Sequence, residues 1–197
     1  MYYDLMINFE DIINHQVEML RYAGKNSDNF TVITTLKKPY SKRPPNFVHD
    51  KIMMDLFPYM VDYTVGIKEW PGTYRSGVSH TVMVTYRLCK SSRYLLEKLE
   101  NWYLPLQNGL PEDICFYRKQ KPWFGSVSHE KMAFMWNATE SDCANLERLS
   151  IKFSIQDKKL RRVFNHNLQW QTNTIQVEVY VIILNQCSQW VNLFLDL

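Results

Sequence analysis

The sequence predicts an α+β fold, in which a mainly antiparallel sheet is built from hairpins and two to four helices pack on it. Two observations indicate hairpins. Alternating apolar residues in segments 61–67 and 80–88 flank a turn-rich stretch, and strand-like segments 114–118 and 123–128 flank a shorter one. A third observation, apolar residues at helical spacing from 8 to 23, supplies the helical part of the class.

The N-terminal part of the chain is expected to form a helix, a strand and a second helix. Asn8 is a suitable N-cap for the first helix, which should end at Ala23, just before Gly24. The β-branched run from Phe30 to Leu36 predicts a strand. The second helix is expected from Phe47 to Pro58, because a proline ring blocks continuation of a helix.

The two predicted hairpins are separated by a helix. In the first hairpin, one face of the return strand is apolar, and Pro71 and Gly72 lie in the turn. Ser91 or Ser92 is expected to cap the helix that follows, which can cover one face of the sheet. After the second hairpin, residues 131–136 are expected to extend its return strand.

The C-terminal part is expected to be rich in strands. Residues 139–149 form a short helix or a loop, and alternation from Ile151 to Ile155 predicts a strand. Residues 175–184 are apolar on both faces, as in an interior strand. We expect a single domain over 1–197, with a weak joint near 157–171 before the strand-rich C-terminal segment.

Composition favours one packed core. Of the 197 residues, 46% are hydrophobic and 14% aromatic, which is enough apolar material for an interior without disulfide staples. The 23 basic and 20 acidic side chains give a net charge of only +3, unlike the one-sided excess of a dedicated nucleic-acid-binding protein.

The cysteines and the N-terminus together predict a cytoplasmic location. The four cysteines, with no closely spaced pair among them, are expected to be buried or half-buried thiols in a reducing compartment. They are Cys89, Cys115, Cys143 and Cys187. No secretory signal precedes residue 13, and no apolar run is long enough to span a bilayer, so no membrane partner is expected.

Catalytic patterns in the sequence are incomplete. His129 and Glu130 begin like a zinc-protease helix motif, but position 133, where a second histidine is required, is alanine. Only 6 glycines are present, and neither a Walker nor a dinucleotide fingerprint occurs, so we expect no cofactor and assign no residue to a metal. An alternative hypothesis keeps a metal-dependent hydrolase that uses His80, His129 and Glu130.

Two further catalytic hypotheses are weaker. The pair His49-Asp50, with His15 upstream, resembles the HD superfamily of metal-dependent phosphohydrolases, but that family is all-helical and this chain is strand-rich. Cys115 is a candidate nucleophile with a histidine base, yet its apolar strand is typical of a buried, inert thiol.

A basic loop provides another alternative. Segment Lys37–Arg43 holds four cations, and such a loop can contact phosphates of a nucleic acid, although a solvated loop is the more common outcome. A nucleic-acid-binding protein using Lys37 to Arg43 therefore stays among the alternatives.

Three short strings stand out in the middle of the chain: Glu69-Trp70-Pro71-Gly72-Thr73, Leu110-Pro111-Glu112-Asp113-Ile114-Cys115-Phe116-Tyr117 and Ser128-His129-Glu130. With Pro122-Trp123 between the last two, their order resembles a group of small bacterial cytosolic proteins without an established activity, some of which carry a sporulation stage III label. The resemblance covers about residues 57–136. It implies a bacterial or phage origin and a cytosolic protein, and it carries no catalytic residues.

The leading functional hypothesis is a non-enzymatic protein-binding module of immunity or inhibitor type. Aromatic residues at turns, balanced charge and the incomplete catalytic patterns favour it over an enzyme. The expected contacts to the partner protein are four aromatic anchors and two acidic residues at the rim. They are Trp70, Tyr74, Trp123 and Phe124, with Glu112 and Asp113.

Overall fold

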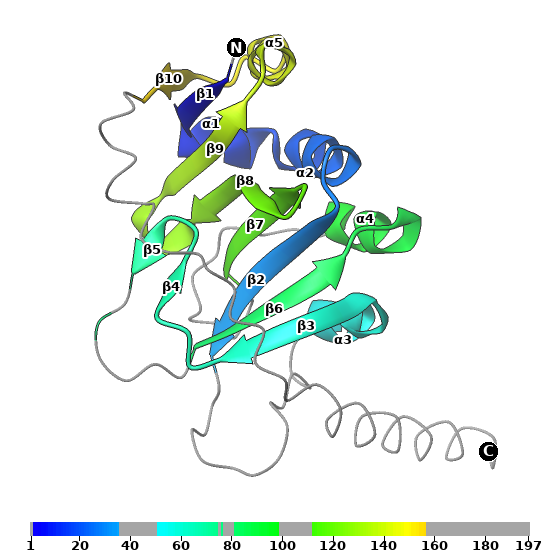
Figure 1. The fold of residues 1–197 in the computed structure, drawn as a ribbon. Coiled ribbons are helices and arrows are strands. Elements are labelled where there is room, and N and C mark those ends of the chain that lie inside the picture. Colours follow the sequence, from blue (N-terminus) through cyan, green and yellow to red (C-terminus); the bar gives the residue numbers. More distant parts are fainter. Residues whose placement is uncertain (1, 36–50, 75, 77–80, 99–111, 157–197) are drawn as a thin grey trace, which may run out of the picture. The chain divides into compact units, whose positions relative to one another are not determined.

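A computed structural model describes residues 2–35, 51–74, 76, 81–98 and 112–156 of the chain, and it confirms the α+β class (Figure 1). The described residues belong to one compact unit. Eight strands form one antiparallel sheet in the order β10-β1-β9-β8-β7-β2-β6-β3, and β4 and β5 form a separate hairpin. No helix in these ranges is both long enough and apolar enough to cross a membrane.

The strands of the large sheet are β1 (Tyr3–Ile7), β2 (Asn29–Thr35), β3 (Met60–Val65), β6 (Thr81–Arg87), β7 (Glu112–Arg118), β8 (Lys121–Val127), β9 (Met132–Ala138) and β10 (Phe153–Ile155). The small hairpin consists of β4 (Glu69–Trp70) and β5 (Thr73–Tyr74). The helices are α1 (Phe9–Asn14), α2 (Gln16–Lys25), α3 (Lys51–Leu56), α4 (Lys90–Glu97) and α5 (Glu140–Arg148), with short 3-10 turns η1 (Phe57–Tyr59) and η3 (Ser128–Glu130).

Both predicted hairpin pairings are confirmed. β3 pairs antiparallel with β6, with the β4–β5 hairpin inserted between them in the chain, and β7 pairs with β8. The expectation that residues 131–136 extend the return strand was wrong. Lys131 adopts a left-handed conformation (φ 54°) at the end of η3, so the chain reverses and β9 becomes a third strand beside β8.

The first predicted helix is two helices. Asn8 caps α1 as expected, since its side chain accepts a hydrogen bond from the Asp11 N–H. At His15 the backbone leaves helical geometry, and α2 then continues to Lys25, beyond the predicted end. Gly24 therefore lies inside α2, where a Cβ would sit 3.1 Å from Cγ of the Arg93 side chain of α4.

Two other helix starts show how local hydrogen bonds decide a boundary. α4 begins at Lys90 with Cys89 as N-cap, so the assignment of the cap to Ser91 or Ser92 was wrong. The hydroxyl of Ser92 instead accepts a hydrogen bond from the Cys89 N–H, 2.9 Å away. α5 begins with a capping box in which Thr139 and Asp142 bond each other's backbone N–H groups.

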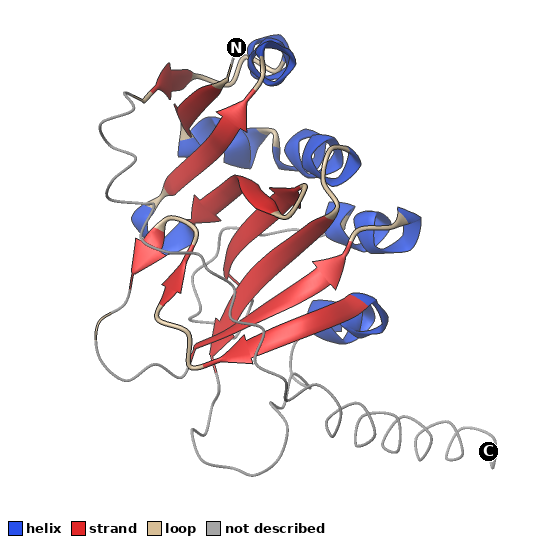
Figure 2. Ribbon diagram, in the orientation of Figure 1, coloured by secondary structure: helices blue, strands red, loops and turns tan. Residues whose placement is uncertain are grey.

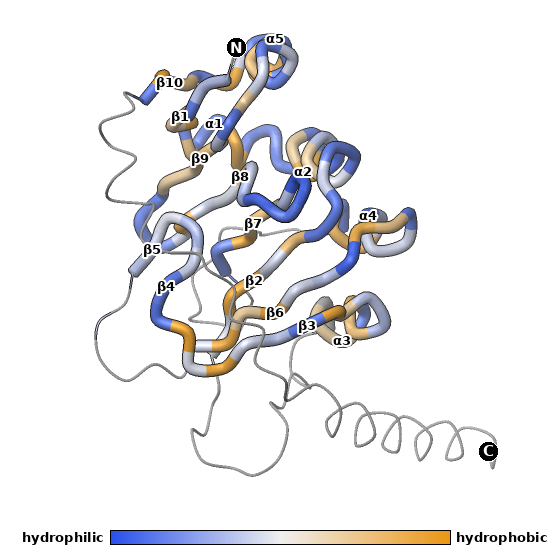
Figure 3. Tube along the Cα trace, in the orientation of Figure 1, coloured by the Kyte–Doolittle hydropathy of each residue, from blue (hydrophilic) through white to orange (hydrophobic). Residues whose placement is uncertain are grey.

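The main core lies between the helices and one face of the sheet. Buried residues of α1, α2, α3, α4 and α5 share a single cluster with the strands, and Figure 2 shows the α-helices gathered along one side of the sheet. A row of aromatic rings runs across β6, β2, β7 and β8 at its centre, in which Tyr86 stacks on Phe30 and Phe116 on Phe124, while Phe30 and Phe116 are tilted to each other. Figure 3 shows hydrophobic residues, in orange, along parts of β2 and β6.

The other face of the sheet carries a smaller cluster. Ile33 of β2 and Met83 of β6 pack there against Trp70 of β4. The β4–β5 hairpin thus covers part of the face that the helices leave uncovered.

Several predictions concern residues outside the described ranges. They are the basic loop Lys37–Arg43, the His49-Asp50 pair, His80, the joint at 157–171, the strand at 175–184 and Cys187.

Candidate functional site

The three conspicuous strings of the sequence meet at one place on this second face. Trp70 comes from β4, Glu112 and Asp113 begin β7, and His129 lies in η3, just after β8. One possible ligand atom each of Glu112, Asp113 and His129 lies within 4.8 Å of the other two. We call these three residues the Glu–Asp–His cluster.

A bulge in β7 directs Asp113 toward the cluster. Between Thr31 and Ile33 on β2, the pairing on β7 passes from Cys115 to Glu112, so β7 holds one residue more than its partner. Asp113 in this bulge has φ 49°, a left-handed conformation that is uncommon for a residue other than glycine. Bulges of this kind change the direction of a side chain next to functional sites.

Both oxygens of the Asp113 carboxylate accept hydrogen bonds. The indole N–H of Trp70 donates to Oδ2 at 2.8 Å, and the backbone N–H of Ser128 donates to Oδ1 at 2.6 Å. The Asp113 N–H in turn donates to the Ser128 hydroxyl at 3.4 Å. Burial raises the pKa of the Asp113 carboxyl above its usual value, although the hydrogen bonds from Ser128 and Trp70 and the nearby His129 oppose the rise.

The cluster combines two buried carboxyl groups with a solvent-accessible imidazole. Glu112 and Asp113 are buried, whereas the His129 side chain is 45% exposed. The imidazole is thus the part of the cluster that reaches solvent.

Of the residues in the alternative hydrolase hypothesis, the structure describes His129 and Glu130, whereas His80 lies outside the described ranges. Oε1 of Glu130 lies 3.8 Å from Nε2 of His129, and the Glu130 side chain is half exposed. The carboxylates next to His129 are Glu112 and Asp113, which sequence analysis placed at the rim of a protein interface. The sequence alone could not reveal which of these residues meet. Trp70 and Asp113, which bond each other at this site, are 43 positions apart in the chain.

Comparison of the chain with protein-family models, with curated proteins and with solved structures gave no match. The resemblance to the small bacterial proteins stays a prediction.

Most of the expected partner-binding anchors lie inside the protein. Trp70 is 5% exposed and Trp123 2%, and Phe124 is fully buried. These side chains fill the two faces of the sheet, so in this structure they do not present a surface to a partner. Tyr74, which is 72% exposed at the end of β5, is the expected anchor that reaches solvent.

Trp123 belongs to a network that joins β7, β8, α2 and α5. The guanidinium of Arg118 stacks 3.7 Å from the Trp123 ring and makes two hydrogen bonds to the Asp142 carboxylate. Tyr22 donates to the same carboxylate at 2.7 Å. Burial alone would raise the pKa of Asp142, but hydrogen bonds from Arg118, Thr139 and Tyr22 outweigh it and hold the pKa below its usual value.

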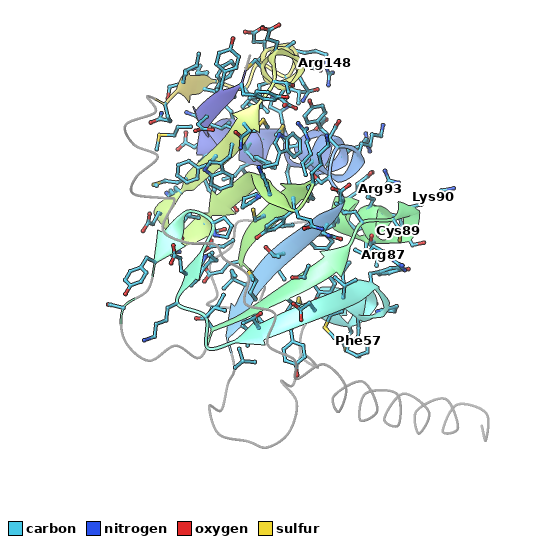
Figure 4. All side chains as sticks on the ribbon, in the orientation of Figure 1. Phe57, Arg87, Cys89, Lys90, Arg93 and Arg148 are labelled. Carbon is cyan, nitrogen blue, oxygen red and sulfur yellow. The ribbon has the colours of Figure 1, made fainter. Side chains whose placement is uncertain are left out.

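The described cysteines are free, and Cys89 and Cys115 differ in burial and in the direction of their pKa shifts. Cys115 is buried, and burial raises its pKa, as expected for an inert thiol. Cys89 at the start of α4 is half-buried, and hydrogen bonds from Ser92 outweigh the effect of burial and lower its pKa. Figure 4 shows Arg87, Lys90 and Arg93 around the same end of α4.

Proposed function

We propose that the protein binds a divalent metal ion at the Glu–Asp–His cluster and uses it for metal-assisted hydrolysis. The observation that supports this proposal is the meeting of two buried carboxyl groups and one imidazole within 4.8 Å. Carboxylate oxygens and an imidazole nitrogen are ligands that suit Zn²⁺ and Mn²⁺. This proposal keeps His129 and Glu130 from the sequence hypothesis and replaces His80 by Glu112 and Asp113.

Three protein ligands leave room for water on the metal. A metal held by Glu112, Asp113 and His129 would lower the pKa of a water bound to it and so supply a nucleophile near neutral pH. Oε1 of Glu130 lies 3.8 Å from Nε2 of His129, and we assign Glu130 the role of the general base that would accept this proton.

Metal titration of the purified full chain tests the binding step. We expect about one Zn²⁺ or Mn²⁺ per chain by calorimetry. We expect His129→Ala to weaken binding by about 100-fold or more, since losing a ligand should cost more than the 10–100-fold that losing a ligand's hydrogen-bond partner costs. His15→Ala is the matched control, since His15 lies at the junction of α1 and α2 and is not part of the cluster. A wild-type protein without stoichiometric binding, or one whose binding survives His129→Ala, contradicts the proposal.

Turnover of chromogenic esters and phosphodiesters tests the hydrolytic step. With metal present, Glu130→Gln should lower kcat by about 100-fold or more while metal affinity stays unchanged, because a general base contributes roughly 10²–10⁴-fold. If Glu130→Gln hydrolyses these substrates as fast as the wild type, Glu130 is not the base.

Binding of a partner protein is a second candidate function, and the open edge of β3 favours it. β3 ends the sheet order, and among the described strands none pairs with its outer edge. Val61 and Val65 are exposed there. A register shift beside Val61 and the Asp62 carboxylate, which accepts a hydrogen bond from the Tyr63 N–H, protect part of this edge, so the part near Val65 is the better candidate. We propose that an extended segment of a partner, in an immunity- or inhibitor-like complex, adds to this edge as a further strand.

Val65→Pro tests this mode of binding. The Gly66 N–H donates to Thr81 of β6, and alternate residues of a strand point to opposite neighbours, so the Val65 N–H points outward. Proline there removes an outward donor without breaking the pairing with β6, and Val65→Thr keeps the donor. Peptides selected from a displayed library on the wild type should bind Val65→Thr but not Val65→Pro, and equal binding to all three would refute strand addition.

A further inference from the structure

The indole of Trp70 lies in a position to control one ligand of the proposed metal centre. We propose that Trp70 is a positioning residue, which holds the Asp113 carboxylate in the orientation that metal binding requires. The proposal rests on the function proposed above for the Glu–Asp–His cluster. It gives the first conspicuous string of the sequence a role in the chemistry of the other two.

Asp113 needs external support because its own backbone does not fix its carboxylate. The residue sits in the β7 bulge, outside the regular pairing with β2. Its two oxygens are each held by a different donor, Oδ2 by the Trp70 indole and Oδ1 by the Ser128 backbone. One donor on each oxygen fixes the rotation of the carboxylate, and each oxygen keeps a second lone pair for a cation.

Trp70 is itself rigidly placed. Its ring is buried against Ile33 and Met83 on the second face of the sheet. Pro71 is buried too, and Gly72 has φ 86° and lies so close to Val127 that a Cβ would come within 2.9 Å of its Cγ2. The β4–β5 hairpin is therefore closely packed on the sheet, and its tryptophan delivers a single polar group to the cluster.

The hydrogen bond joins the hairpin to a ligand and not merely to the sheet. Partners of metal ligands commonly fix the orientation of the ligand, and their loss weakens metal binding by 10–100-fold. A purely structural role of the same bond predicts a different result, namely lower stability with unchanged metal affinity in the folded protein.

Trp70→Phe separates these two roles, because it removes the indole N–H and keeps an aromatic ring. The matched control is Trp123→Phe. Trp123 is also buried, but its Nε1 has no hydrogen-bond partner in the structure, so this substitution removes an indole N–H without removing a hydrogen bond. Each variant is titrated with Mn²⁺ by calorimetry, its folded fraction is followed by circular dichroism, and the electron paramagnetic resonance spectrum of bound Mn²⁺ is recorded.

We expect Trp70→Phe to bind Mn²⁺ 10–100-fold more weakly with an altered Mn²⁺ spectrum, and Trp123→Phe to match the wild type. Equal affinity and spectrum for folded Trp70→Phe and wild type overturn the positioning role and leave the metal centre standing. No Mn²⁺ binding by the wild type removes both. If Trp70→Phe does not fold, benzothienylalanine is placed at position 70, because it replaces the indole N–H by sulfur in a ring system of the same shape. Its Mn²⁺ affinity and spectrum are then compared with those of the wild type, and the same two outcomes apply.

Discussion

Gly72 illustrates how one position can be fixed by two independent constraints. Its φ of 86° lies in the left-handed region, where any residue other than glycine is strained. A Cβ at this position would also lie 2.9 Å from Val127 and 3.5 Å from Phe134, both on the sheet beneath the hairpin. The backbone conformation and the close approach therefore require glycine for separate reasons.

Gly72→Ala should destabilise the protein by about 1–3 kcal/mol, since alanine at a positive φ and overpacking against the sheet both oppose folding. Urea unfolding followed by circular dichroism measures the loss. Gly24→Ala is the matched control, because Gly24 is helical and its nearest atoms belong to the flexible Arg93 side chain. That substitution should be neutral or stabilise by up to about 1 kcal/mol. A loss of stability in Gly24→Ala equal to that in Gly72→Ala would contradict this account.

At the scale of elements, Asp142 connects α5 to the rest of the protein. It completes the cap of α5, binds Arg118 at the end of β7 and accepts a hydrogen bond from Tyr22 of α2. Because its pKa is lower in the folded protein than in the unfolded chain, the folded state binds fewer protons in the acid range. This contribution to stability is complete above the unfolded pKa of about 3.9, and it disappears as pH falls through the folded pKa.

Asp142→Asn should therefore cost about 2–3 kcal/mol at pH 7, within the range for hydrogen bonds to charged groups. The difference between wild type and variant should shrink as pH falls below about 4, because Asp142 then takes up a proton in the unfolded chain while the folded carboxylate is still ionised. Unfolding curves at a series of pH values measure this difference. Glu147→Gln on the exposed side of α5 serves as control and should change stability by less than about 0.5 kcal/mol. A difference for Asp142→Asn that stays constant from pH 7 to pH 2 would be inconsistent with the lowered pKa.

Elements with strong local patterns were predictable from sequence, and elements that depend on distant partners were not. The Asn8 cap, the alternation in β6 and the two hairpin pairings are local features, and the structure confirms them. β1 was not predicted, because a strand of five residues has little pattern of its own and gains its place from pairing with β9 and β10.

At the scale of the whole molecule, the candidate site arises from contacts between segments distant in sequence. The sequence identified the three strings but not their convergence, so Trp70 and Asp113 were assigned to an exposed interface while they bond each other in the interior. The residues next to a tryptophan in a turn can be the same whether its ring is buried or exposed, so the local sequence does not decide between the two. Only the bulge in β7 and the turn at η3 bring the carboxylates to the imidazole.

The position of β1 determines how the chain must be assembled. Its two neighbours in the sheet, β9 and β10, follow it by well over one hundred residues. As the polypeptide leaves the ribosome, its first strand has neither neighbour until nearly all described elements have been translated. The sheet can therefore close only once β9 has been translated, and a fragment that stops before β9 lacks both partners of its first strand.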